Sequence, residues 1–413
     1  MAQTLAQKLV ARAAGRSAVT PGEIVTCKVD LAMMHDSGGP RRVKPMLERL
    51  GAKVWDPSKV VVITDHYVPT FDEDSRKIIR IARDWVREAG IENFYDEQGI
   101  CHVVLPERGH LRPGMFAVGG DSHSPTGGAF AAYMFGIGAT EMLGVLVTGE
   151  IWLKVPHTIA MEFSGKLSGG VSAKDIMLFL IGRFGLDGGQ YQAVEYRGAG
   201  IRALPMQERM TLCNMTAELG GQTGLIASDS VTEDFLKNKI QTWDSDPDAP
   251  LMAHHRFDAS ALAPQVAAPH SPANSKAVHE FKHVKPTVAY IGACTGAKLE
   301  DLRMAARVLR NRKSRVKLMV APASLRDQKE AEKDGTLKVL EDAGAEFLGL
   351  GCGICAGYGG KVLGENVVAI STTARNFKGR MGAASSQVYL ASPYTVAASA
   401  VAGHVCDPRE MLQ

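Results

Sequence analysis

The stretch TVAYIGACTGAK, residues 287–298, is the part of the sequence that says most about the fold. An apolar run, residues 287–291, passes through a glycine-rich loop into LEDLRMAARVL, residues 299–309, which is helix-like. A continuous apolar strand that leads directly into a helix is typical of a parallel sheet covered by helices on both faces. The loop between strand and helix carries a cysteine, Cys294.

The same order of apolar run, unusual loop and helix-like segment recurs along the chain, and this alternation predicts an α/β architecture. Ligands of open α/β sheets bind beyond the carboxyl ends of the strands, so these loops are candidates for one shared site. The further apolar runs are Val60–Thr64, Met115–Val118, Lys317–Val320, Glu346–Leu350 and Val367–Ser371.

A change of composition marks one boundary. Residues 243–285 are rich in Pro, Ala, Asp and His, which is typical of a crossing segment between two parts of a chain. We therefore predict an N-terminal part over residues 1–285, including this segment, and a C-terminal part over residues 286–413. The sequence has no internal repeat of fixed period.

Bulk properties exclude several classes of protein. Hydrophobic residues make up 45% of the 413 residues and charged residues 22%, as in ordinary globular proteins. A net charge of +3 is too small to indicate nucleic-acid binding. The most apolar stretch, residues 131–155, contains Glu141 and Glu150, so we expect buried core rather than a membrane span. We expect neither a nucleic acid nor a membrane as partner.

The N-terminal segment is basic and lacks acidic residues, which leaves two interpretations. It resembles a transit peptide in composition. The interpretation we favour is an amphipathic first helix, because Leu5, Leu9, Val10 and Ala13 share one helical face.

Seven cysteines are an odd number and are scattered, which is a poor basis for a disulfide framework. A reducing compartment, the cytoplasm, is the better interpretation, and clustered thiols there bind metal or do chemistry. Cys352 and Cys355 form a C-x-x-C motif, which occurs in redox dithiols, zinc sites and iron–sulfur sites. A redox pair needs no third cysteine, and a structural zinc usually has four ligands. Together with Cys294 the motif gives three thiolates, which on a cubane cluster leave one iron open as a Lewis acid.

Acid–base groups follow two of the strand-like runs. Asp65-His66 and Asp121-Ser122-His123 each place a carboxylate beside an imidazole, which fixes the tautomer of the imidazole and raises its basicity. His102 lies ahead of the second set. A lone histidine is usually structural. Two Asp/His sets at strand ends make a role in general acid–base catalysis as well supported as a structural role.

Two arginines lie five residues apart in ARNFKGRMG. Arg375 and Arg380 offer guanidinium forks of the kind that bind carboxylates. The alternative interpretation is a pair of ordinary surface arginines.

These motifs together resemble the aconitase superfamily, and within it most closely the large subunits of 3-isopropylmalate dehydratase. The resemblance runs from TLAQKLVARAAG, residues 4–15, to AGHV, residues 402–405. It implies three α/β/α subdomains around a central cluster site, two of them in residues 1–285 and the third, with the cysteines, in residues 286–413. It also implies a hydro-lyase that dehydrates, hydrates or isomerises a small malate-type dicarboxylic acid, as in leucine biosynthesis.

The resemblance assigns a role to each motif residue. It implies one [4Fe–4S] cluster per subunit, held by Cys294, Cys352 and Cys355, with Asn214 of CNMTAELGG beside it. Protonation and handling of the leaving hydroxyl and water would involve Asp65, His66, His102, Asp121, His123 and Glu218. Substrate binding would involve Arg375, Arg380, Ser122 and, from the loop MMHDSGGP, His35, Asp36 and Ser37.

Several positions depart from the usual pattern of this family. Ala374 and Gly296 stand where the family usually has asparagine, Lys378 replaces an acid, and Ile354 replaces Pro or Met. Because these positions surround the cluster and the substrate, a paralogous dehydratase for 2,3-dimethylmalate, citramalate, maleate or homoaconitate is the alternative.

The resemblance also implies a partner. The C-terminal swivel domain of single-chain aconitases, which supplies the catalytic base, has no counterpart here, so we expect a separate small subunit to provide it. Two other classes of protein fit the sequence less well. The interpretation as a zinc- or redox-dependent C-x-x-C enzyme does not explain Cys294 or the GDSH motif, residues 120–123. A non-catalytic RNA-binding relative disagrees with the mild charge and the retained catalytic motifs.

Overall fold

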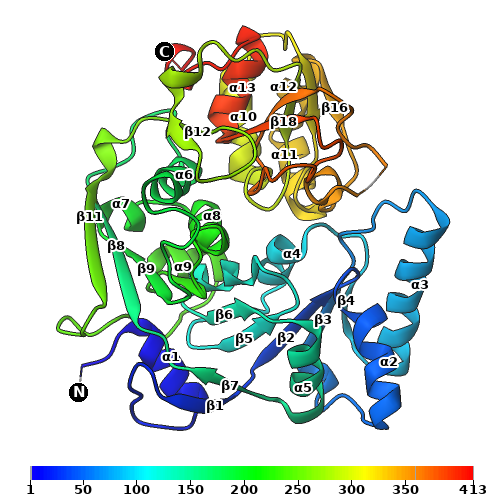
Figure 1. Cartoon of the computed structure of the whole chain (residues 1–413), viewed down its shortest axis with the longest axis vertical. Coiled ribbons are helices and arrows are strands. Elements are labelled where there is room, and N and C mark those ends of the chain that lie inside the picture. Colours follow the sequence, from blue (N-terminus) through cyan, green and yellow to red (C-terminus); the bar gives the residue numbers. More distant parts are fainter. Residues whose placement is uncertain (1, 359, 413) are drawn as a thin grey trace.

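The computed structural model describes residues 2–358 and 360–412. Within this part of the chain the strands form four sheets, three of them larger and mainly parallel and one a two-stranded ribbon. Figure 1 shows the C-terminal part, in yellow to red, above the N-terminal part, in blue to green.

The first large sheet has the strand order β4-β3-β2-β5-β6, and all of its strand pairs are parallel. Alternate residues of each strand point to opposite faces. One face packs against α1, α2, α3 and α5, and the other packs against α4. The elements are β2 (Leu31–His35), β3 (Val60–Ile63), β4 (Asn93–Tyr95), β5 (Phe116–Gly119), β6 (Tyr133–Gly136), α1 (Leu5–Ala13), α2 (Pro40–Leu50), α3 (Glu73–Glu88), α4 (Cys101–Glu107) and α5 (Ala139–Thr148).

The second large sheet is parallel with the order β10-β9-β8-β11. Helix α6 begins after Ser172, whose backbone N–H and hydroxyl donate to Asp175 in the first helical turn. The elements are β8 (Thr158–Ser164), β9 (Ala193–Arg197), β10 (Thr223–Leu225), β11 (Ala253–Asp258), α6 (Ala173–Phe184), α7 (Ala199–Arg202), α8 (Met206–Asn214) and α9 (Ser230–Leu236).

The third large sheet has the order β13-β12-β18-β17-β14-β15-β16. Its central strands are parallel, and β12 runs antiparallel to both β13 and β18. The elements are β12 (Gln265–Ala267), β13 (Ser275–Ala277), β14 (Val288–Ile291), β15 (Lys317–Val320), β16 (Ala345–Phe347), β17 (Val368–Ser371), β18 (Gln387–Ala391), α10 (Leu299–Leu309), α11 (Leu325–Lys333), α12 (Thr336–Asp342) and α13 (Pro393–Ala402).

The predicted α/β architecture is confirmed, and the opening stretch forms β14, a loop and α10 as its pattern indicates. The predicted first helix is α1, with Leu5, Leu9, Val10 and Ala13 all buried. The apolar stretch 131–155 forms β6, α5 and β7 (Glu150–Lys154), which pairs with β1 (Ile24–Lys28). Among the described residues, no helix is both long and apolar enough to cross a bilayer.

The proline-rich segment 243–285 contributes strands to two different sheets. Strand β11 pairs with β8 in the second sheet, whereas β12 and β13 belong to the third. The segment therefore crosses between the two sheets, although it is not free of regular structure. Its use as a domain boundary stays a prediction.

Candidate active site

The loops that follow several strands meet at one place. The loop after β3 contacts the cysteine-pair loop, because the Cys352 N–H donates to the Asp65 carbonyl at 2.7 Å. The loop after β17 reaches the first sheet, because Arg375 Nη2 donates to Ser122 Oγ at 2.9 Å. Residues separated by more than 250 positions in the sequence thus share one site, as the strand-end argument predicts.

Asp121 lies at the centre of four imidazole rings. Its Oδ1 atom is 2.7 Å from His102 Nε2 and accepts the His123 backbone N–H at 2.8 Å. Its Oδ2 atom is 3.9 Å from His35 Nε2 and 4.0 Å from His66 Nε2. Burial alone would raise the pKa of Asp121, but the neighbouring imidazoles, His102 first, hold that pKa well below its usual range. Asp121 is therefore a fixed negative charge among groups that carry protons.

Asp65 and His66 form a tight pair on the loop after β3. Asp65 Oδ1 is 2.6 Å from His66 Nδ1, and Asp65 Oδ2 accepts the Cys101 N–H at 2.8 Å. Burial lowers the pKa of His66, but the charge of Asp65 outweighs it and raises that pKa well above its ordinary value. The His35 ring stacks on His66 with centroids 4.1 Å apart, and burial followed by the His66 charge lowers the pKa of His35. This environment favours a protonated His66.

Asp36 anchors the loop that carries this pair. Its Oδ1 accepts the N–H groups of Asp65 and His66, both at 3.0 Å, and its Oδ2 accepts that of Tyr67 at 2.7 Å. Both oxygens are thus committed to backbone, so Asp36 shapes the loop rather than offering a free carboxylate. Ser37 accepts Arg41 Nε through its carbonyl at 2.7 Å.

The three predicted cluster cysteines come from two loops of the third sheet. Cys294 follows β14, Cys352 is the N-cap of the short 3-10 helix Gly353–Ala356, and Cys355 lies within that helix. Asn214 Nδ2 donates to Cys294 Sγ at 3.3 Å. Burial raises the pKa of Cys352 to about 12, and burial together with the two neighbouring thiols raises that of Cys294 well above its usual value. In the absence of a bound cation, burial therefore favours the protonated form of these two thiols.

The spacing of the thiols bears on what they would hold. Among the described residues, Cys294, Cys352 and Cys355 do not belong to a group of three ligand atoms that lie within 4.8 Å of one another. Two thiolates about 2.3 Å from one tetrahedral zinc would lie only about 3.8 Å apart. The three thiols are therefore not arranged to bind one zinc ion together.

Glu218 and Arg375 form an ion pair directly beside His123. Glu218 Oε1 accepts from His123 Nε2 at 2.9 Å and from Arg375 Nε at 2.6 Å. Burial raises the pKa of Glu218, but the charges of His123 and Arg375 lower it overall. The second carboxylate oxygen of Glu218, Oε2, is buried and has no hydrogen-bond partner within the described part of the chain.

Two more orphaned polar atoms lie on predicted site residues: Asn214 Oδ1 and Arg380 Nε are both buried without a partner in the part of the chain that the structure describes. Buried polar atoms are normally satisfied, so orphans on three predicted site residues indicate groups that the bound cluster and substrate would supply. The residues present therefore fit a three-cysteine cluster with an anionic substrate beside it.

Two buried lysines next to the cysteines had no role in the sequence-based site. Lys298 Nζ donates to the Cys294 carbonyl and Thr211 Oγ1, both at 2.9 Å, and to Asp301 Oδ2 at 2.7 Å. Lys174 lies in VSAKDIMLFLIG, where a lysine just before the apolar run IMLFLIG is the one signal that could have found it.

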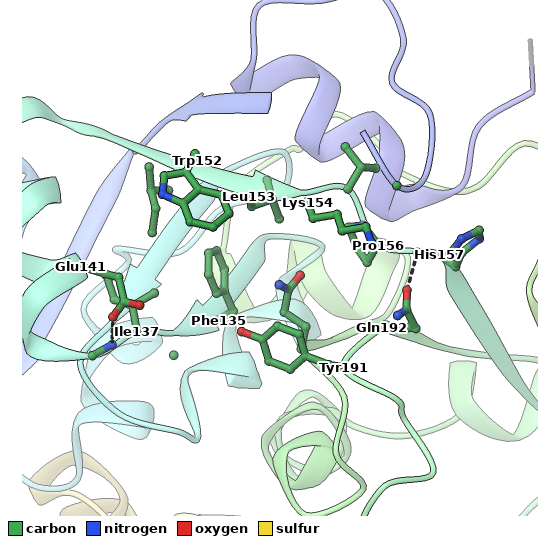
Figure 2. Close-up of a pocket in the computed structure, with 16 residues that line it drawn as sticks. Phe135, Ile137, Glu141, Trp152, Leu153, Lys154, Pro156, His157, Tyr191 and Gln192 are labelled. Atoms are coloured by element: carbon green, nitrogen blue, oxygen red, sulfur yellow. Dashed lines mark hydrogen bonds between the residues drawn. The ribbon is translucent and has the colours of Figure 1, made fainter. Parts of the chain in front are cut away.

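A separate cavity of about 530 Å³ lies between β6, β7 and the segment before β9. Figure 2 shows Trp152 on one side of it and Tyr191 on the other, with Phe135 between them. None of the predicted site residues lines this cavity. The candidate site is thus defined by converging polar groups and lies apart from this cavity.

Comparison with known proteins points to one family. Residues 7–403 match the model of the aconitase family (aconitate hydratase). The chain is 44% identical to 3-isopropylmalate dehydratase large subunit 1 of Methanopyrus kandleri over 100% of both chains. It is 45% identical to a probable methanogen homoaconitase large subunit of Methanosarcina mazei, over 93% of this chain and 99% of that one.

The solved structure of Thermococcus kodakaraensis aconitase X (holo-form) matches 85% of this chain and 84% of its own with a TM-score of 0.50. At 12% identity this likeness bears on the fold alone. The full-length match to the family model and the identities above 40% establish that this chain belongs to the aconitase family.

Proposed function

We propose that the chain is the large subunit of a [4Fe–4S]-dependent hydro-lyase that acts on a malate-type hydroxy acid, with 3-isopropylmalate as the favoured substrate. The observation that carries this proposal is the convergence of Asp121, its four histidines and the Glu218–Arg375 pair beside three cysteines. Membership of the aconitase family supports it.

The cluster would be held by Cys294, Cys352 and Cys355, and when bound it would supply a Lewis acid through the iron that has no thiolate ligand. Asn214 would orient Cys294 through its 3.3 Å hydrogen bond to the sulfur.

Side chains of this subunit would supply proton transfer, orient the histidines and bind the substrate. His66, held protonated by Asp65, is placed to give a proton to the departing hydroxyl. Asp121 would fix the orientation of His102 and His123. Arg375 and Arg380 would bind the substrate carboxylates, since a guanidinium fork matches a carboxylate in shape and charge.

A second polypeptide would complete the site. Removing a proton from carbon next to a carboxylate requires a base, and we assign that base to a separate small subunit of the swivel-domain type. The relatives named as large subunits support this assignment.

A second candidate function has a specific observation in its favour. The methanogen homoaconitase relative is as similar to this chain as the 3-isopropylmalate dehydratase relative, at 45% against 44% identity. A paralogous activity on homoaconitate, or on 2,3-dimethylmalate, citramalate or maleate, is therefore the alternative.

The test uses anaerobically reconstituted chain mixed with its cognate small subunit. Ultraviolet absorbance follows the unsaturated acid formed from 3-isopropylmalate, homocitrate, 2,3-dimethylmalate, citramalate and malate. We expect turnover of 3-isopropylmalate that disappears in Cys352→Ser and on omission of the small subunit. If only another of these acids is turned over, that acid replaces 3-isopropylmalate as the assigned substrate. If a chain that holds iron and sulfide turns over none of them, the proposal is overturned.

A further inference from the structure

Lys174 makes hydrogen bonds to two loops of the candidate site. Its side chain is 1% exposed and belongs to the first turn of α6. Nζ donates to the carbonyls of Thr372 and Thr373 at 2.5 and 2.6 Å, and to Thr295 Oγ1 at 3.2 Å. Thr295 follows the first cysteine, and Thr372 and Thr373 lead into the segment that carries Arg375. One ammonium group therefore contacts both the cysteine loop and the arginine loop.

The charge of this ammonium has no carboxylate partner. Within the described residues no carboxylate oxygen lies within 4 Å of Lys174 Nζ, whereas the equally buried Lys298 pairs with Asp301 at 2.7 Å. Buried charges are normally paired, because an isolated ion that leaves water loses a large favourable solvation free energy. A cation in the first turn of a helix is also disfavoured by the helix dipole. Both features call for an anion nearby.

Thr295, which Lys174 Nζ contacts, directly follows Cys294, so the groups beside Lys174 that become anions when they bind metal are cysteine thiols. Burial lowers the pKa of Lys174 to about 8, and the group that opposes this shift most is Cys355, followed by Asp301 and Cys294. Asp301 is already engaged by Lys298. The remaining counter-charges are therefore two of the three predicted cluster ligands.

We propose that Lys174 is a positioning residue whose buried ammonium is the counter-charge of the anionic cluster held by Cys294, Cys352 and Cys355, and whose hydrogen bonds tie the cysteine loop to the arginine loop. The inference rests on the proposed function in that it needs a thiolate-bound cluster. Thiolate ligands are anions, so a fixed cation beside them stabilises the loaded site and favours the reduced state of the cluster.

Three substitutions separate charge from hydrogen bonding. Lys174→Met removes both, Lys174→Gln keeps two N–H donors without the charge, and Lys174→Arg keeps the charge. The exposed Lys166, eight residues away along the chain, gives a matched control in Lys166→Met, which removes a solvent-exposed charge.

The readouts are iron loss to a chelator and the midpoint potential of the reconstituted large subunit, titrated with redox dyes and followed by electron paramagnetic resonance. We expect Lys174→Met and Lys174→Gln to lose iron faster, on the order of tenfold for the loss of one buried charge, and to show a more negative potential. Lys174→Arg and Lys166→Met should stay close to the wild type.

A Lys174→Gln variant with wild-type iron loss and potential would overturn the inference. Circular dichroism checks folding, and if Lys174→Met fails to fold, Lys174→Gln decides the question. A wild-type chain that binds no iron and sulfide would instead overturn the proposed function, and this inference with it.

Discussion

Replacing Asp36 by alanine should destabilise the chain through the loop that carries His66. The Asp36 carboxylate accepts three backbone N–H groups at 2.7 to 3.0 Å and is fully buried. Hydrogen bonds to a charged group contribute about 1.5–3 kcal/mol each, and such contributions overlap when they share one carboxylate. Because alanine leaves all three donors without an acceptor, we expect a loss of about 3–5 kcal/mol in the free energy of unfolding.

Urea unfolding of the chain, followed by circular dichroism, measures this loss. Asp36→Asn keeps one acceptor oxygen and should lose about half as much. Asp56→Ala is a matched control, because Asp56 also accepts a backbone N–H, that of Ser58 at 3.1 Å, but at a solvent-accessible turn. A loss for Asp36→Ala no larger than that for Asp56→Ala would refute the view that this carboxylate shapes the catalytic loop.

Three other perturbations test separate parts of the account. Burial and the charge of Asp327 raise the pKa of Glu107 from 4.5 to about 8, so the folded state binds more protons than the unfolded state between these values. Stability should therefore fall as the pH rises through this window, and less so in Glu107→Gln; equal pH dependence of the urea midpoints would contradict the assignment. A Cβ on Gly296 would lie 2.1 Å from a neighbouring Cβ, whereas one on Gly144 in α5 meets nothing within 4 Å. Gly296→Ala should lower the melting temperature. Gly144→Ala should increase the free energy of unfolding by about 0.5–1 kcal/mol and so raise the melting temperature. Similar thermal shifts for both variants would count against the packing at the cysteine loop. Arg375→Lys keeps the charge but loses the fork, so kcat/KM should fall by about tenfold or more, and an unchanged value would exclude the arginine from substrate binding.

Much of the fold could be predicted because buried parallel strands are continuous apolar runs. The runs at 60–64, 317–320 and 367–371 correspond to β3, β15 and β17 within one residue at each end. Strand β18 and the pairing of β1 with β7 were not predicted. Strands β1 and β7 lie more than 120 residues apart, and nothing local in either sequence specifies its partner.

The candidate site was predictable as a set of residues but not as a network. Asp65-His66 and the GDSH motif stand out because their residue types and positions after strands are unusual. The role of Asp36 as a loop anchor depends on three backbone N–H groups from another loop, which a sequence does not display. Lys174 escaped notice for the same reason, since the loops that it contacts are 121 and 198 residues away.

The central claim is that three cysteines hold an iron–sulfur cluster, and metal and sulfide analysis tests it most directly. The anaerobically reconstituted chain should contain about four iron and about four sulfide per polypeptide, with a large loss in each of Cys294→Ser, Cys352→Ser and Cys355→Ser. Cys27→Ser removes a buried thiol from the core around α1 and should retain the full content. Zinc without sulfide in the wild-type chain, or a Cys352→Ser variant with undiminished iron and sulfide, would contradict the account.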